Sequence, residues 1–291
     1  MSDSRGVQKG QAYVGAFRPK DNLTQVKLVV AFRGTENLEN WIENLDIAKT
    51  DHAMSCKGCK AHSGFVNIWT AFQKPVLAEL MKLHSLYPSA KLLVTGHSLG
   101  AAVALIAGYS LQYDIGMDVA GVYTYGCPRV GNQAFSDFLD GRGRQQPQPQ
   151  PQPPGSQLRI ATAAPSSEEA ATRARAAQQT MAESRRAEAP YAAADATVRE
   201  HDGVIVAADG PFSPFPYWRI THGRDPVPHL PPRWIGFMHV ATEIFFKFDN
   251  HTHVVCDGTG EDRECSNRHW VDLSVFDHLH YYGETTGIVA C

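Results

Sequence analysis

The sequence lacks any long hydrophobic run, because none of its apolar stretches approaches the roughly 18 consecutive residues of a membrane-spanning helix. It also lacks an excess of basic charge: 27 Lys and Arg residues stand against 30 Asp and Glu residues, which gives a formal net charge of −3. Proteins that bind nucleic acids through their phosphates usually carry a strong basic excess. These absences exclude a transmembrane segment and argue against a nucleic-acid partner.

Cysteine is scarce as well, since six residues in a chain of 291 are too few for a small fold held together mainly by disulfides. Four of the six nevertheless fall in two tight local pairs, and two N-x-S/T triplets occur, at Asn22 and Asn250. Both features favour an oxidising, extracellular compartment. The first residues, MSDSRGVQKGQ, contain no apolar core of the kind that a signal peptide needs.

The sequence does contain alternating strand and helix patterns. Short apolar runs predict strands at 27–32, 91–95 and 119–125. Apolar residues at helical spacing predict helices at about 65–86, with Pro75 as a kink or a helix start, and at 101–111. Because strands and helices alternate, we expect an α/β protein with a mostly parallel central sheet flanked by helices.

This pattern breaks at Gly141. Residues 145–154, QQPQPQPQPP, form a Pro/Gln repeat that fits neither a helix nor a central strand. Residues 166–200 are rich in Ala, Glu and Arg and poor in large apolar side chains, so they cannot build a core of their own. We predict one domain over 1–291, interrupted by a long low-complexity insertion at about 141–213; a boundary between two domains is the alternative.

Between a predicted strand and a predicted helix lies GHSLG, residues 96–100, which fits the G-x-S-x-G nucleophile elbow. A serine held at a strained, positive φ needs neighbours without side chains, so that the strand and the helix can close around it. The N-terminus of the helix would place its partial positive charge beneath the serine. We therefore interpret Ser98 as a nucleophile rather than an ordinary loop serine.

A serine hydroxyl is a weak nucleophile and needs a base that a carboxylate orients. In folds with this elbow the order along the chain is Ser, then Asp or Glu, then His. Asp225 follows the predicted strand YWRITH and would lie at its carboxyl end, although an Asp that starts a proline turn is the plainer interpretation. The residues alone leave the base open among four histidines: His222, His229, His278 and His280. We expect His97, inside the elbow, to pack beside the base.

Taken together, these residues resemble the class 3, fungal-type lipase family of the α/β-hydrolase superfamily. The segments similar to family motifs occur in the family's order: VVAFRGT, NWIENL, HSGF, TGHSLGAA, YGCPRVGN, RITHGRDPVPHLPP and DHLHYYG. The resemblance covers most of the chain outside the insertion. It implies an α/β-hydrolase fold with Ser98 as nucleophile, Asp225 as acid and His278 as base.

The resemblance also implies an oxyanion hole formed at Thr35 and Leu99. One of these backbone N–H groups would lie just past an apolar strand and the other at a helix N-terminus, and both could point at a developing alkoxide. A helix N-cap is a second interpretation of Thr35.

Residues 36–46, ENLENWIENLD, predict a short amphipathic helix whose apolar stripe consists of Leu38, Trp41, Ile42 and Leu45. The periodicity leaves open whether this stripe simply packs on the core. The segment coincides with the family's lid, whose apolar face covers the site in water and turns toward a lipid surface when one is present. We therefore expect transient contact with a lipid interface through Leu38, Trp41 and Ile42. Neutral lipid is favoured, because the opposite face of the helix is acidic.

The cysteine pairs have family counterparts. Cys256 and Cys265 match a disulfide position of the family, and some members have a bridge where Cys56 and Cys59 stand. For the CKGC pair, a redox-active dithiol and a zinc site with a nearby histidine are the alternatives. The pair lies in a polar loop and the sequence offers no fourth zinc ligand, so both alternatives are disfavoured. Cys127 is expected to be a small buried residue.

We expect a carboxylester hydrolase, with triacylglycerols at lipid–water interfaces as the first choice of substrate. The reaction would pass through an acyl-enzyme and needs no metal and no cofactor. Within the same fold, the alternatives are a phospholipase A1 or galactolipase and a feruloyl-type esterase. The alternative from another class is a non-catalytic, lipid-binding relative.

Overall fold

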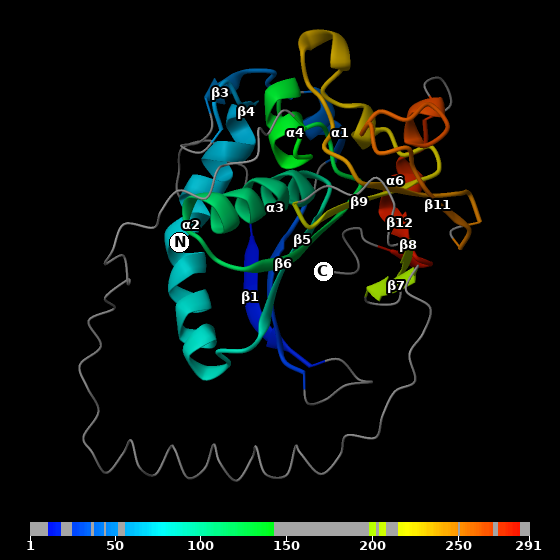
Figure 1. The fold of residues 1–291 in the computed structure, drawn as a ribbon. Coiled ribbons are helices and arrows are strands. Elements are labelled where there is room, and N and C mark those ends of the chain that lie inside the picture. Colours follow the sequence, from blue (N-terminus) through cyan, green and yellow to red (C-terminus); the bar gives the residue numbers. More distant parts are fainter. Residues whose placement is uncertain are drawn as a thin grey trace, which may run out of the picture. The chain divides into compact units, whose positions relative to one another are not determined.

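A mostly parallel sheet forms the centre of the fold (Figure 1). Its strand order is β1-β2-β5-β6-β9-β10-β11, in which β2 to β10 run parallel and the edge strands β1 and β11 run antiparallel to their neighbours. The strands are Ala12–Phe17 (β1), Lys27–Phe32 (β2), Lys91–His97 (β5), Val119–Tyr125 (β6), Tyr217–His222 (β9), Glu243–Phe246 (β10) and His253–Val255 (β11). The predicted α/β-hydrolase architecture is confirmed.

The structure, a computed structural model, describes residues 11–18, 25–35, 38–43, 45–51, 56–142, 198–201, 204–207, 215–249, 251–269 and 273–285. Contacts divide the chain into two units, residues 1–144 with 211–291, and residues 145–210. In the second unit the described residues form an antiparallel hairpin of β7 (Val198–His201) and β8 (Val204–Ala207). The sequence analysis did not predict this hairpin, although Asp-Gly between two β-prone runs is typical of a two-residue turn.

Most of the predicted insertion at 141–213 lies outside the described residues, so its extent and its place in a single domain stay predictions. Asn22 and Asn250, the two glycosylation candidates, also lie outside them. No helix in the described part of the chain is long and apolar enough to cross a bilayer.

Two helices cover one face of the sheet. α3 (Leu99–Tyr109) packs against β5 and β6, and all its residues are buried because α2 (Ser63–Leu86) lies on its other side. Side chains on the covered face of β5, such as Leu92 and Val94, are buried, whereas Leu93 and Thr95 on the other face are half-buried. Within the described residues, the other helices are α1 (Leu38–Glu43), α4 (Gln133–Leu139) and α6 (Val275–Leu279), with a π-helical turn at Ser110–Asp114 and single 3-10 turns at Val227–His229, Arg233–Ile235 and Ser266–Arg268.

The predicted elements agree with this arrangement except at some of their ends: β5 runs to His97 rather than ending at residue 95, and helix ends differ as well. α2 begins at Ser63 and runs through Pro75, so Pro75 does not start the helix. The helix starts earlier because the His62 ring caps it: its Nδ1 accepts a hydrogen bond from the Gly64 N–H at 3.1 Å. Two short hairpins complete the fold, β3 (Lys49–Asp51) with β4 (Lys60–His62), and β12 (His280–Tyr281) with β13 (Glu284–Thr285).

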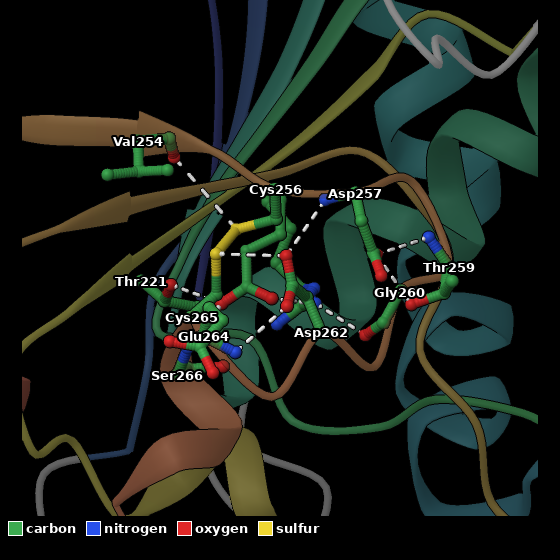
Figure 2. The surroundings of a disulfide bond; sticks show 12 residues. Thr221, Val254, Cys256, Asp257, Thr259, Gly260, Asp262, Glu264, Cys265 and Ser266 are labelled. Atoms are coloured by element: carbon green, nitrogen blue, oxygen red, sulfur yellow. Dashed lines mark hydrogen bonds and ion pairs between the residues drawn. A yellow bond between two sulfur atoms is a disulfide. The ribbon is translucent and has the colours of Figure 1, made fainter.

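Both predicted cysteine pairs form disulfides, Cys56–Cys59 and Cys256–Cys265, and Cys127 is a buried free thiol whose pKa burial raises to about 12. Figure 2 shows the second disulfide at the base of a polar loop. Within this loop the carboxylate of Asp262 accepts hydrogen bonds at 2.9 Å from the backbone N–H groups of Asp257 and Glu264. The loop between the two cysteines is therefore tied both covalently and by its own side chains.

The packing of α2 on the core can be tested with a pair of adjacent residues. Leu80 is fully buried and Met81 is 58% exposed. We expect Leu80→Ala to lower the free energy of unfolding by about 2–5 kcal/mol through lost burial and the cavity left behind. Met81→Ala, the control, should change it by about 0.5 kcal/mol or less. Urea denaturation measures both, and equal effects would contradict the packing described.

Candidate active site

Ser98 occupies the turn between β5 and α3 with φ 57° and ψ −126°, a strained conformation for a residue other than glycine. A Cβ on Gly96 would overlap the backbone of Gly100, and a Cβ on Gly100 would overlap the carbonyl group of Phe32. The two glycines therefore let strand and helix close around the serine, as the sequence predicted. The turn has the geometry of a nucleophile elbow.

Asp225 lies just past β9 and is 2% exposed. Its carboxylate accepts three hydrogen bonds: from the Val227 N–H at 2.8 Å, from the Tyr281 hydroxyl at 2.6 Å and from His278 Nδ1 at 2.8 Å. Burial alone would raise the pKa of Asp225, but the charge that His278 can carry and these hydrogen bonds hold it below its usual value. The group is thus kept as a carboxylate beside the imidazole.

His278, on α6, is buried with its ring directed at that carboxylate. Because a carboxylate can only accept, Nδ1 carries the ring proton and Nε2 is left with its lone pair. Neither His278 Nε2 nor Ser98 Oγ has a hydrogen-bond partner among the described residues, although both atoms are buried. Two buried, unsatisfied polar atoms of this kind are expected where a substrate binds.

The ring of His97 links the elbow to His278. His97 Nε2 lies 2.8 Å from the backbone carbonyl oxygen of His278, and the two rings are 4.5 Å apart. Burial and the neighbouring His278 lower the pKa of His97 to about 4, so this ring is neutral at neutral pH and donates its N–H to the carbonyl. Since Ser98 directly follows His97, the structure brings the elbow and the Asp225–His278 pair to the same end of the sheet.

The other three histidine candidates do not bond to Asp225, whose hydrogen bonds within the described residues are the three given above. His222 Nδ1 lies 3.1 Å from the carbonyl oxygen of Asp277. His280 stacks on Phe276 and bonds to its carbonyl oxygen. For His229, burial and then the charge of Arg129 lower the pKa to about 4. His278 is thus the candidate base that the geometry favours.

The predicted oxyanion positions border the elbow. The N–H of Leu99 is the first of α3, where the first N–H groups of a helix have no intrahelical partner. On the other side, a Cβ on Gly34 would lie 3.3 Å from the Cβ of Ser98 and 2.9 Å from the carbonyl oxygen of His97. Thr35 therefore follows a residue that is in contact with the elbow.

The predicted lid is α1. Trp41 is 4% exposed and its ring stacks on Phe65 with the ring centroids 6.4 Å apart. Leu38 and Ile42 are half-buried against the same core, and Glu43 on the opposite face is exposed. In this structure the apolar stripe thus packs on the protein, an arrangement that a closed lid and an ordinary core helix share.

Sequence reasoning missed two residues of the site. Tyr281 donates the shortest hydrogen bond that Asp225 receives, and its position three residues after His278 is the one signal that could have suggested it. Gly126 follows β6 with φ 56°, and a Cβ there would lie 2.7 Å from Asp225 Oδ2 and 2.9 Å from His278 Cε1. Glycine is needed because this loop packs directly on the pair.

Comparison with known proteins gives a consistent picture. Residues 29–149 match the family described as Lipase (class 3). A lipase of Rhizomucor miehei is 27% identical over 265 residues, which are 90% of this chain and 53% of that protein. Secreted mono- and diacylglycerol lipase 1 of Fusarium solani is 28% identical, over 92% of this chain and 60% of its own length. The chain therefore spans between half and three fifths of the length of these relatives.

Solved structures of similar proteins share the fold. The native propeptide complex of the Rhizomucor miehei lipase aligns with a TM-score of 0.64 and 26% identity, covering 98% of this chain and 68% of that one. A second structure, described as a triacylglycerol lipase whose catalytic centre is a serine protease triad, aligns with a TM-score of 0.60 and 27% identity, over 91% of this chain and 74% of that one.

The role of the carboxylate can be tested by Asp225→Asn. An amide in its place would favour the tautomer with the proton on Nε2, so the imidazole could no longer accept a proton. We expect kcat on a soluble short-chain ester to fall by about 10⁴-fold with the fold intact. Asp118→Asn, at an 88% exposed carboxylate, is the control and should retain activity. A loss of less than tenfold for Asp225→Asn would show that this carboxylate does not orient the base.

Proposed function

We propose that the chain is a member of the class 3, fungal-type lipase family and, on this premise, that it is a serine carboxylester hydrolase acting on triacylglycerols at lipid–water interfaces. The observation that carries the proposal is the buried His278–Asp225 hydrogen bond beside a serine in an elbow conformation, with His278 Nε2 and Ser98 Oγ both unsatisfied. A relative whose structure is described as having a serine protease triad in a triacylglycerol lipase supports the same chemistry.

In the proposed reaction, His278 Nε2 takes the proton of Ser98 as Oγ attacks the ester carbonyl carbon. The negative charge that develops on the carbonyl oxygen is stabilised by the backbone N–H groups of Leu99 and Thr35, each worth about 3 kcal/mol in comparable sites. Asp225 stabilises the imidazolium that forms. His278 then protonates the departing alcohol, which leaves an acyl group on Ser98.

Water completes the cycle by the same steps in reverse order. His278 accepts a proton from the water that attacks the acyl-enzyme, and returns it to Ser98 as the fatty acid leaves. The two half-reactions use one base, so its orientation must be maintained throughout. Asp225 with its three donors, and His97 at the backbone of His278, provide that orientation.

Replacing the nucleophile tests this proposal. We expect Ser98→Ala to abolish labelling by a fluorophosphonate probe and to lower kcat by about 10⁶-fold, since removal of the nucleophile from such a triad leaves only binding and oxyanion stabilisation. The control is Ser85→Ala, because the Ser85 hydroxyl lies at the surface and donates a hydrogen bond to the Lys82 carbonyl oxygen. Labelling of the Ser98→Ala protein would mean that another serine is the nucleophile.

The lid is proposed to work by exchanging one apolar environment for another. Burial of a large apolar side chain is worth about 1.5–3 kcal/mol, so moving Trp41, Leu38 and Ile42 from the protein core into a lipid surface can offset the cost of opening. The buried indole of Trp41 on Phe65 represents the closed state. The acidic opposite face favours neutral lipid droplets over anionic membranes.

A lid of this kind predicts interfacial activation. The hydrolysis rate should rise steeply when a triacylglycerol substrate exceeds its solubility limit, because the new surface stabilises the open lid. The variant Leu38→Ser with Ile42→Ser should reduce that rise several-fold while activity on a dissolved short-chain ester changes little. Leu86→Ser, at a 68% exposed leucine at the end of α2, is the control. The absence of any rise in the wild-type protein would refute the lid.

Partial glycerides are a second candidate substrate, favoured by the similarity to a secreted mono- and diacylglycerol lipase. Rates on tri-, di- and monoacylglycerol emulsions of one acyl chain distinguish the two, and phospholipid and feruloyl esters in the same assay test the remaining alternatives. We also propose an extracellular location, because the structure contains two disulfides and similar lipases are secreted.

A further inference from the structure

A polar cavity of about 560 Å³ lies among residues that the proposed hydrolysis does not use. Its volume is in the range of small-molecule sites, but its lining is polar rather than apolar. The walls come from the 3-10 turn that starts at Arg233 and from the loop closed by the Cys256–Cys265 disulfide. The lining residues are Arg233, Glu261, Arg263, Glu264, Asn267 and Arg268.

The floor of this cavity is rigidly built. The Glu261 side chain is 4% exposed and forms a two-pronged ion pair with the fully buried Arg129, at 2.8 Å on each side. Asn267 Nδ2 and the His239 N–H donate to the same carboxylate at 2.8 and 3.0 Å. Burial alone would raise the pKa of Glu261, but the hydrogen bond from Arg129 and the charges around it hold it well below the usual value.

The disulfide fixes the remaining wall. Cys265 directly precedes the 3-10 turn Ser266–Arg268, so the covalent bond to Cys256 anchors the segment that carries Arg263 and Arg268 (Figure 2). The carboxylate of Asp262 accepts the backbone N–H of Glu264 at 2.9 Å. The loop is therefore held in place on both sides of the two arginines.

The charge that faces the cavity is positive. Arg233 lies with its Nε 3.7 Å from Glu261 Oε2 and its side chain 46% exposed. Arg263 and Arg268 are exposed, and their guanidinium groups make no ion pair with any residue in the described ranges. Two carboxylates also line the cavity. The charge of Glu261 is already balanced by the buried Arg129, so Glu264 is the negative charge that remains against the three arginines.

We propose that this cavity is a binding site for a phosphate monoester group. Arginine binds phosphate oxygens through paired N–H donors, and three guanidinium groups around one cavity suit the several oxygens of a tetrahedral dianion better than a flat carboxylate. The volume leaves room for the group that the phosphate esterifies. That ligand is either a soluble phosphorylated molecule or the headgroup of a lipid such as phosphatidic acid.

Binding of phosphate itself is tested by calorimetric titration with inorganic phosphate, using the full chain carrying Ser98→Ala. We expect the double variant Arg263→Gln with Arg268→Gln to weaken phosphate binding at least tenfold. The matched control removes two exposed cations outside the cavity, Lys57→Gln with Lys74→Gln, and should change binding less than twofold. Thermal unfolding of both variants verifies that the fold is retained.

Vesicles identify the source of the phosphate. Flotation with phosphatidylcholine vesicles, with and without 20% phosphatidic acid, measures headgroup binding, and Trp234→Ala removes the 85% exposed indole that follows Arg233. If the protein is retained on phosphatidic acid vesicles, and both the arginine and the tryptophan variants reduce that retention, the ligand is a lipid headgroup. If the protein binds phosphate but is not retained on the vesicles, the ligand is a soluble molecule.

No phosphate binding, or equal loss of binding in the lysine control, would overturn the proposal. These results do not depend on hydrolysis, so the proposed function and the cavity fail separately.

Discussion

The close approach of α3 to β5 is the constraint on which the rest of the site depends. Gly96 and Gly100 meet where any side chain would overlap backbone, and the turn between them holds Ser98 at a φ that costs about 1–3 kcal/mol for a residue other than glycine. That strain persists because α3 is buried along its whole length between the sheet and α2. The wholly buried α3 therefore holds the Ser98 hydroxyl in a position that a free chain would not adopt.

The proposed acid and the proposed base reach this turn from distant parts of the sequence. Asp225 comes from the end of β9 and His278 from a helix of five residues, which is too short to be stable by itself. What fixes α6 is contact: the Ser274 hydroxyl caps it, and His97 binds the carbonyl oxygen of His278. The long segment at about 141–213 precedes the amino end of β9, whereas Asp225 follows the carboxyl end of that strand, so the segment joins the sheet away from the edge that carries the candidate site.

How far the sequence could predict this site depends on how local each signal is. Ser98 was predictable because strand, glycines and helix are adjacent in the chain, and the strand at 27–32 because its apolar run is short and bounded. Periodicity and spacing alone left the base open among His222, His229, His278 and His280, because they carry no information on which ring meets Asp225. The family resemblance singled out His278, the ring that bonds to Asp225 in the structure. Sequence reasoning did not identify Tyr281 and Gly126 for the same reason, because each acts through a contact between residues that are distant in the chain. Pro75 shows the converse, a local signal overridden by packing and by the His62 cap.

A charged histidine next to His278 would disfavour a positive charge on the His278 ring, and burial keeps the neighbouring His97 uncharged. An imidazolium at position 97, with its ring 4.5 Å from that of His278, would oppose the positive charge that His278 acquires in the proposed reaction. Because burial lowers the pKa of His97 to about 4, its ring stays neutral and contributes only an N–H donor. Asp225, in contrast, stays charged despite its burial, because hydrogen bonds from three donors help to lower its pKa. Of these two buried groups beside His278, therefore, His97 is neutral and Asp225, whose charge would stabilise an imidazolium, is ionised.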